Sequence, residues 1–400
     1  MATAAETSPT IHPAPREATC PFAPPPAYQQ ARHDEPISRV TLYDGNTALL
    51  ITRHEDVRAI LADNRFSSDP ANPGFPFLTE GSRQLLNVKP TFIRLDDPEH
   101  GRLRRMLTGD FTVRKTAELR TEIQRITDEL IDRMIDGRQQ ADLVGEFALP
   151  LPSLVICLLL GVPYQDHDFF QECSRTLLHR GATTEEIVEA NNRLTEYLDV
   201  LTASKRDNPD DGILSRLVER GELEIEDIGA MGRLLLIAGH ETTANMTALS
   251  VLALLRNPEQ LAHLRAHPED TPAAVEELLR YLSIVQTGLV RVAVADAEIG
   301  GTKIRAGEGV ILQVNTANWD DGRYPGADTL DLTRDTRHHL AFGFGVHQCL
   351  GQPLARLELE IALETLLRRL PDLKLAVPFE DVPFRHDMLI YGVHELQVAW

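Results

Sequence analysis

Residues 339–356, HLAFGFGVHQCLGQPLAR, place a single cysteine in a glycine-rich segment, next to a histidine and directly before a predicted helix. The spacing from Phe342 to Gly351 is FxxGxxxCxG. Glycine permits turns and close backbone approaches closed to other residues, and Pro353 is tolerated in a first helical turn. Cys349 therefore lies at a predicted helix N-terminus, where free N–H groups stabilise a thiolate. A thiolate in such a cage is a metal ligand or a nucleophile; the alternative is a structural cysteine beside a loop.

Composition narrows the class of protein. The chain has 400 residues and a formal net charge of −20, which disfavours nucleic-acid binding. Its length predicts two or three domains or one large fold. No CxxC pair occurs, so a zinc site is not expected. Four cysteines are too few for a disulfide scaffold in a chain of this length, so a reducing cytoplasm fits best. The four cysteines are Cys20, Cys157, Cys173 and Cys349.

The N-terminus lacks the basic and apolar regions of a signal peptide. Residues 1–20 are rich in Pro, Ala and Thr and are predicted to form a flexible arm. The most apolar run, residues 148–163, is interrupted by prolines and shorter than the roughly 20 residues of a bilayer span. It is predicted to be a buried helix, and no membrane anchor is expected.

Hydrophobic periodicity predicts a mainly α fold with a smaller β part. A β-hairpin is expected over residues 37–52, around the turn-forming Asp44-Gly45 pair. Later strands are expected over 291–315 and in the tail from 373 to 400. Helices are predicted over 53–63, 99–111, 113–135, 148–162, 185–204, 225–256, 258–266, 271–282 and 353–370. Residues 67–92 and 164–185 look irregular, as either lids over a site or plain surface excursions.

Three further patterns carry polar groups that need an explanation. The apolar helix over 234–255 holds Glu241 and Thr242 at its middle, where buried polar groups need partners. These residues could bind water and relay protons, or belong to a kinked core helix. Glu277 and Arg280 form an i, i+3 pair of a kind common on solvated helices. The last pattern is a set of donors able to hold two carboxylates, each alone more typical of a surface: His100, Arg104, Arg291 and His347.

Together these features resemble the cytochrome P450 family of haem-thiolate monooxygenases. FGFGVHQCLG is similar to the family's haem-binding loop, AGHETT to its oxygen-activation helix, and ELLR to its core ExxR motif. The order and separations of the motifs also match. The resemblance is strongest to soluble actinomycete (Streptomyces-type) enzymes that modify secondary metabolites and xenobiotics. It implies that residues 21–400 form a single triangular catalytic domain, with haem between the oxygen-activation helix and the cysteine loop.

The resemblance assigns roles to the patterned residues. It implies haem b, iron protoporphyrin IX, with Cys349 as axial ligand. Glu241 and Thr242 would manage protons and oxygen, although many relatives have Asp where Glu241 stands. Glu277 and Arg280 would be structural, tying their helix to the region before the cysteine loop. The remaining cofactor contacts implied are His100, Arg104, Arg291 and His347 for the propionates, with Phe342, Gly343, Gly351 and Ala238 around the haem.

The family's reaction implies partners. It uses O2 and two electrons to hydroxylate or epoxidise a substrate, and this chain has no flavin or nicotinamide module. A ferredoxin and an NAD(P)H-linked ferredoxin reductase are therefore expected, and relatives are usually monomers. Arg102, Arg105 and Arg356 would form a basic docking patch. The alternatives are a peroxide-driven peroxygenase and a non-catalytic haem-thiolate ligand-binding protein.

The family's pattern also places substrate contacts, and in this sequence most of them are aliphatic. A hydrophobic, fairly large molecule is therefore expected, such as a polyketide or macrolide, a steroid-like or a statin-like compound. Arg83 and His179, in the two candidate lids, could hold a carboxylate or hydroxyl. The predicted contacts are Leu86, Val88, Leu178, Leu234, Ile237, Leu289, Val290 and Ile390.

Overall fold

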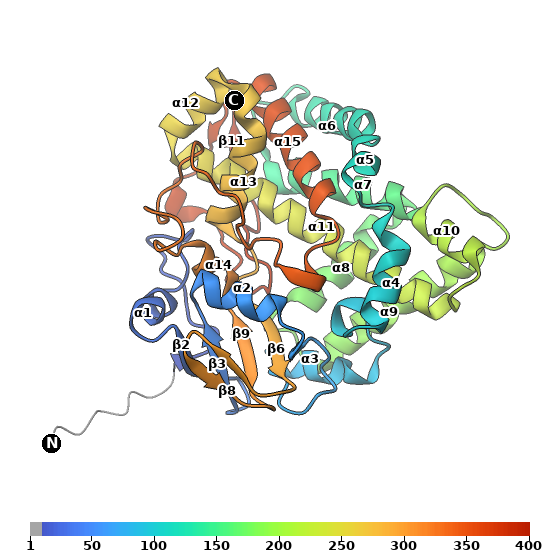
Figure 1. The fold of residues 1–400 in the computed structure, drawn as a ribbon. Coiled ribbons are helices and arrows are strands. Elements are labelled where there is room, and N and C mark those ends of the chain that lie inside the picture. Colours follow the sequence, from blue (N-terminus) through green and yellow to red (C-terminus); the bar gives the residue numbers. More distant parts are fainter. Residues whose placement is uncertain (1–9) are drawn as a thin grey trace.

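The computed structural model describes residues 10–400, and one long helix organises it (Figure 1). Helix α11, Ile225–Arg256, spans 32 residues and is apolar on almost every side. A helix that is hydrophobic all round has to be enclosed by other elements. Helices α7 (Pro150–Leu160), α9 (Thr184–Ser204) and α15 (Gln352–Arg369) pack against it and bury it.

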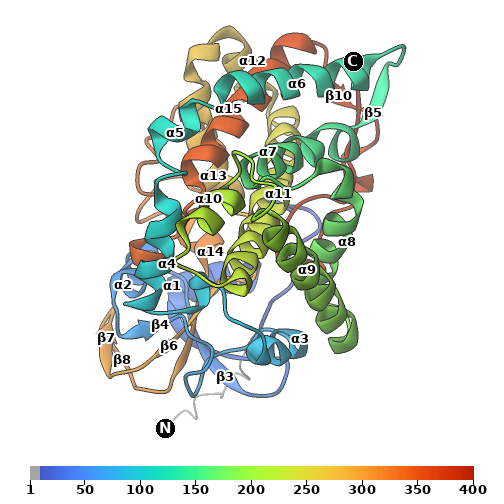
Figure 2. The same cartoon turned by 90° about the vertical axis from the view of Figure 1, so that its right-hand side faces the viewer.

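The other helices enclose this centre, and most lie where the periodicity predicts them (Figure 2). The predicted helix over 113–135 is broken, because the chain turns through short i→i+3 hydrogen bonds at Glu118 and Leu119. The bounds are α1 Pro26–Asp34, α2 His54–Ala62, α3 Glu80–Gln84, α4 Glu99–Thr108, α5 Val113–Ala117, α6 Arg120–Ile135, α8 His167–Leu178, α10 Ile213–Arg220, α12 Pro258–Ala266, α13 Thr271–Leu282 and α14 Val314–Asn318.

The expectation that residues 164–185 are irregular is wrong. Most of this segment is helix α8, whose aromatic and charged residues segregate onto opposite faces. Phe170, Cys173 and Ser174 are buried at helical spacing, while Asp168 and Glu172 are exposed. The mixture of residue types is thus an amphipathic helix.

A six-stranded sheet lies at one end of the molecule, at the lower left of Figure 1. The predicted hairpin is confirmed: β2 and β3 pair antiparallel, and Gly45 takes the left-handed φ of 81° in the turn. Strand β6 lies beside β9 and brings Arg291 toward the middle of the molecule. The strands, in spatial order, are β1 Thr10–Ile11, β2 Ile37–Thr41, β3 Thr47–Ile51, β9 Gly309–Leu312, β6 Leu289–Ala293 and β4 Phe66–Ser67.

The tail is less strand-like than predicted. Residues 373–400 contribute only β10 (Lys374–Leu375) and β11 (Gln397–Ala399), which join β5 (Gln140–Asp142) in a small sheet. Between them the chain runs irregularly, held by isolated bridges such as Val285 to Ile390. The remaining predicted strands form the hairpin of β7 (Ala297–Ile299) and β8 (Thr302–Ile304).

The N-terminal arm also needs correction. Residues 10–12 are not loose: Thr10 and Ile11 pair with β2, and the His12 side chain is buried. Residues 1–9 of the expected arm lie outside the described residues. The main apolar core runs from Phe22 to Val398 and so draws on both ends of the chain. Within residues 10–400, no helix is both long and apolar enough to cross a bilayer.

Candidate active site

Two glycines fix the loop that carries Cys349. Gly343 and Gly345 have φ values of 68° and 74°, in the left-handed region that disfavours side chains. A Cβ at Gly345 would also lie 2.2 Å from the backbone oxygen of Leu61 at the end of α2. The Cys349 N–H closes the loop by donating to the Phe342 carbonyl over 2.9 Å. Glycine is therefore required at position 345 because the loop backbone passes close to the end of α2.

The Cys349 thiol lies directly before the N-terminus of α15, where it is accessible. Burial of its surroundings raises its pKa, while the N–H groups of Gly351 and Gln352 and the nearby Arg104 and Arg356 lower it. These are the groups that stabilise a thiolate once a cation binds it. By contrast, burial raises the pKa of the Cys157 thiol to about 12. Cys349 combines accessibility with donors, as a ligand must.

Helix α11 is open along one stripe. Leu234, Ile237, Ala238 and Thr242 are partly or fully accessible, whereas most of the helix is buried. Positions i, i+3, i+4 and i+8 share one face of a helix. The Thr242 hydroxyl donates to the Ala238 carbonyl over 2.6 Å, a back-bond that bends helices. The predicted oxygen-activation residues therefore flank an exposed strip on a buried helix that packs against α15.

A cluster of buried and partly buried histidine and arginine side chains lies beside the cysteine loop. The rings of His100, on α4, and His347 are 4.0 Å apart, centroid to centroid. Burial, Arg291 and His100 lower the pKa of His347 to about 3. Burial and the nearby Arg94 lower the pKa of Arg291 to about 10. Sequence reasoning missed Arg94, because nothing in its local pattern separates it from a surface arginine.

Several polar groups of this cluster have few or no hydrogen-bond partners. His100 Nε2 and His347 Nδ1 are buried and have no hydrogen-bond partner among the residues that the structure describes. Arg291 donates only to its own neighbour's carbonyl, that of Val290, and Arg104 donates to Gln348 over 2.6 Å. Buried polar groups in proteins are nearly always paired. Carboxylates would accept from Arg104 and Arg291, and from a ring nitrogen once its imidazole is protonated, so the cluster fits the two propionates of a haem.

Glu241 is buried in an ion pair that sequence reasoning missed. Its Oε2 lies 3.1 Å from Nη1 of Arg385, which comes from the irregular tail. Asn245 bridges the two, accepting from Arg385 over 3.0 Å and donating to the Glu241 carboxylate over 3.3 Å. The carboxylate is 144 residues from its partner along the chain, a separation with no local signal. The pair engages only one of the two carboxylate oxygens, Oε2.

Glu277 and Arg280 have the interlocking arrangement expected of a structural pair. Both side chains are fully buried, with Nε to Oε2 at 2.7 Å and Nη2 to Oε1 at 2.8 Å. Arg280 also donates to the carbonyls of Asn318 and Ala327, and Glu277 accepts from the Asp331 N–H. The pair thus ties α13 to the segment that precedes the cysteine loop.

The structure brings some predicted substrate contacts together and separates others. Leu234 and Ile237 lie on the open stripe of α11. Leu289 lies on the same face of β6 as Arg291, beside Gly343. Val290 points the other way, into the core with Tyr28 and Phe75, so its assignment to the site is contradicted by the alternation of the strand.

Leu178 and Ile390 meet at the tail. The Leu389 N–H donates to the Leu178 carbonyl over 2.8 Å, and Ile390 pairs with Val285. Leu86 is 42% exposed and Val88 is half-buried, in the loop that follows α3. The candidate-lid residue His179 bonds Asp387 in the tail over 3.0 Å, and Arg83 approaches Asp44 at 3.9 Å.

The expected docking arginines differ in availability. Arg356 is held by Glu276 at 2.5 Å and lies over the Phe342 ring, so it belongs to the support of the cysteine loop. Arg102 pairs with Glu99. Arg105 is exposed on α4 and has no ion pair within residues 10–400. Only Arg105 keeps the free charge that the docking hypothesis needs.

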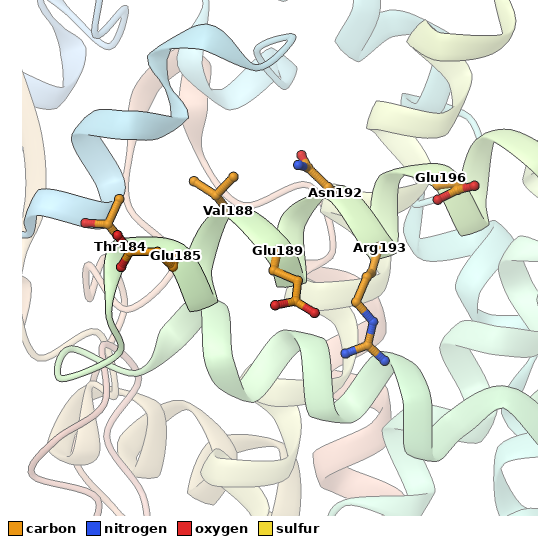
Figure 3. A pocket seen from close by; sticks show the side chains of 7 residues that line it. All are labelled: Thr184, Glu185, Val188, Glu189, Asn192, Arg193 and Glu196. Atoms are coloured by element: carbon orange, nitrogen blue, oxygen red, sulfur yellow. The ribbon is translucent and has the colours of Figure 1, made fainter.

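A shallow groove on the outer face of α9 lies apart from these residues (Figure 3). Three of its seven lining residues are acidic, and none of the seven belongs to the predicted site. They are Thr184, Glu185, Val188, Glu189, Asn192, Arg193 and Glu196. The groove is a solvated helix face.

Comparison with known proteins agrees with this geometry. The family model described as Cytochrome P450 matches residues 269–371. Cytochrome P450-SU2 of Streptomyces griseolus is 61% identical over 404 residues, covering 100% of both chains. Pentalenic acid synthase of Streptomyces avermitilis is 50% identical and covers 96% of each. The crystal structure of the mycinamicin VIII C21 methyl hydroxylase MycCI from Micromonospora griseorubida, bound to mycinamicin VIII, superposes with a TM-score of 0.91 at 41% identity, covering 98% of this chain and 100% of that chain.

Proposed function

The chain belongs to the cytochrome P450 family, and on that premise we propose that this monooxygenase binds haem b through Cys349 and hydroxylates or epoxidises a hydrophobic, fairly large substrate. The observation that carries the proposal is the pair of buried ring nitrogens without partners, His100 Nε2 and His347 Nδ1, beside Arg104 and Arg291 and next to an accessible cysteine at a helix N-terminus. A buried nitrogen without a partner costs stability, and a bound carboxylate would favour protonation of the ring and then accept from it.

The chain's own residues divide the work. Haem held by a thiolate supplies O2 activation. His100, Arg104, Arg291 and His347 would hold its carboxylates. Thr242 presents a hydroxyl on the open stripe, and the Glu241 carboxylate is ion-paired with Arg385. Arg385 would hold Glu241 by Oε2 and leave Oε1 to carry a proton, so the tail would position the carboxylate for proton delivery.

The substrate class follows from the aliphatic contacts and the relatives. Leu234, Ile237 and Leu289 offer apolar surface and no charge, which favours a molecule bound by its hydrocarbon surface. The names of relatives, a pentalenic acid synthase and a mycinamicin hydroxylase, support a terpenoid- or macrolide-like compound. Polyketide, steroid-like and statin-like compounds are also hydrophobic and fairly large, so the proposal includes them.

Electrons would come from a ferredoxin and its NAD(P)H-linked reductase, with Arg105 contributing to the contact. A monomer in the cytoplasm belongs to the same proposal. If hydrogen peroxide alone supported faster turnover than this electron chain, the peroxygenase alternative would replace it. Ligand binding without any product under full reducing conditions would favour the non-catalytic alternative.

The first test addresses Cys349 itself. Cys349→Ser is expected to lose the red-shifted ferrous–CO absorbance band that marks thiolate ligation. Cys20→Ser, which removes another accessible thiol, is the matched control and should keep the band. Retention of the band in Cys349→Ser would overturn the assignment.

The second test addresses the substrate. The ferric protein is titrated with a panel of terpenoids, macrolides and steroids, and the Soret band is followed. Binders are then incubated with ferredoxin, reductase, NAD(P)H and O2, and products are examined by mass spectrometry. A product heavier by one oxygen atom supports the proposal. If members of the panel bind and none of them is converted to a product, the proposal is contradicted.

A further inference from the structure

Residues 10–16, here called the N-terminal brace, reach across the molecule to two segments far along the chain. Thr10 and Ile11 pair with β2, and the His12 N–H donates to the Thr41 carbonyl over 2.8 Å. From this anchor the side chains of His12 and Arg16 extend into the body. The brace therefore has a fixed end on the sheet and two side chains that act elsewhere.

His12 completes a chain of buried hydrogen bonds. Its Nε2 lies 3.1 Å from the Thr287 carbonyl, which can only accept, so Nε2 carries the proton. Its Nδ1 then accepts from the Tyr28 hydroxyl at 2.7 Å, and that hydroxyl accepts from the Ala14 N–H at 2.6 Å. Burial lowers the pKa of His12 to about 4, so the ring is neutral at pH 7, as this arrangement requires. Every donor in the chain has one acceptor.

Arg16 makes the second contact. Its guanidinium carbon lies 4.0 Å from the ring centroid of Tyr391, and its Nη1 donates to the Ala23 carbonyl over 2.5 Å. Tyr391 is buried and its N–H donates to the Ile284 carbonyl over 2.8 Å. The ring face attracts the guanidinium cation, and partial loss of water around the contact strengthens this attraction.

The two segments that the brace touches also hold each other. Residues 284–289 follow α13 and end at Leu289; residues 384–391 form the tail loop and include Ile390. Val285 pairs with Ile390, and the Gln286 amide donates to the Arg385 carbonyl over 3.1 Å. Both Leu289 and Ile390 are among the proposed substrate contacts. The brace thus contacts both segments, through the Thr287 carbonyl and the Tyr391 ring.

We propose that the N-terminal brace sets substrate affinity, with His12 and Arg16 as positioning residues for segments 284–289 and 384–391. The inference rests on the proposed function in one respect, that Leu289 and Ile390 contact substrate. Neither His12 nor Arg16 touches the cysteine loop, so haem binding does not depend on them. Loss of the brace frees two lining segments and leaves the cofactor site intact.

Hydrogen exchange of the haem-loaded protein tests the positioning role without any turnover. His12→Leu removes both hydrogen bonds, and exchange in 284–289 and 384–391 is expected to rise about five- to tenfold, since one buried hydrogen bond contributes about 1 kcal/mol. His12→Gln keeps a donor for Thr287 and should restore most of the protection. Ile11→Thr, at an exposed position of the same strand, should change nothing. Unchanged exchange in His12→Leu, or a rise spread over the whole chain, would overturn the inference.

Azole binding tests the link to substrate. Econazole, which is large, and 4-phenylimidazole, which is small, are titrated into each variant and the Soret shift is measured. We expect econazole to bind about fivefold more weakly to His12→Leu, with 4-phenylimidazole and the haem content unchanged. If His12→Leu does not take up haem, Arg16→Met, which keeps the aliphatic stem and removes the charge over Tyr391, supplies the same comparison. Equal econazole affinities would overturn the inference, whatever the result of the turnover assay for the proposed function.

Discussion

Two groups of polar side chains in this protein differ in whether every buried nitrogen and oxygen has a hydrogen-bond partner. Around Glu277 and Arg280, carboxylate oxygens and guanidinium nitrogens meet each other or backbone groups. Around His100 and His347, one ring nitrogen of each residue is buried without a partner in the described chain. Glu277 and Arg280 are fully buried, whereas His347 is only partly buried although its unpaired nitrogen is hidden from water.

The difference indicates what each group is for. A buried ion pair with every bond made is complete, and its role is to hold segments together. A buried nitrogen without a partner is costly by itself, and where it lies beside arginines a bound anion could offset that cost. Unpaired buried atoms also occur elsewhere in the described chain, such as His240 Nε2 and Glu358 Oε2. The proposed cofactor site is distinguished by unpaired nitrogens that lie together beside the accessible Cys349.

Breaking the complete group should have the largest effect. Glu277→Ala leaves Arg280 charged, fully buried and without its carboxylate. The free energy of unfolding should fall by about 3–5 kcal/mol. Urea unfolding of the haem-loaded protein, followed by circular dichroism, measures this. Glu122→Ala, which breaks an exposed pair with Arg125, should change stability by less than about 1 kcal/mol. Similar losses in the two variants would contradict the comparison.

Glu276 forms a second fully hydrogen-bonded group with His339 and Arg356, and protonation of its carboxylate at low pH should disrupt this group. Burial alone would raise its pKa, but hydrogen bonds from His339 and Arg356 lower it from 4.5 to about 2. Because the folded-state pKa is the lower one, this stabilisation is present above pH 4.5 and is lost as pH falls toward 2. The loss should reach about 3 kcal/mol.

The stability of the parent and of Glu276→Gln, measured from pH 6 downward, checks this effect. The parent should lose more stability than the variant below pH 4.5. Parallel curves would show that the Glu276 pair contributes nothing.

Removing a member of the open group should leave the fold intact and weaken cofactor retention. Arg291→Leu deletes a donor proposed for a propionate. Each charge-assisted hydrogen bond contributes about 1.5–3 kcal/mol, so haem should bind about 10- to 100-fold more weakly. Transfer of haem to apomyoglobin measures the loss, and urea unfolding of the apoprotein serves as the control for stability. A large drop in apoprotein stability with unchanged haem transfer would reverse the roles assigned to the two groups.

An exposed charge with no partner should give the smallest effect. Arg105→Glu is expected to weaken ferredoxin binding a few-fold and to reduce its salt dependence, because rim charges mainly steer association. Arg102, already paired with Glu99, should matter less when neutralised to Gln. Identical affinity and salt slope for Arg105→Glu and the parent would exclude Arg105 from the contact.

Local signals determined much of this protein from sequence alone. The glycines, Cys349 and the helix start after Gly351 lie within a few residues of one another, so their geometry follows from backbone preferences. The 32-residue span of α11 and the hairpin at Gly45 likewise follow from hydrophobic period and turn chemistry. Even the misplaced Val290 was readable, since alternation along β6 puts it opposite Arg291.

What the tertiary structure decided are pairings between distant residues. Arg385 meets Glu241 across 144 residues, and His12 meets Thr287 across 275. No local pattern encodes such a partner, because it depends on how several packed segments settle together. The same holds for the unused nitrogens of His100 and His347: sequence supplied the histidines, but only the packed chain shows that nothing within residues 10–400 satisfies them. The sequence determined which polar groups this protein has. Tertiary packing decided which of them find partners within the chain and which are left for a ligand, because those partners come from distant segments.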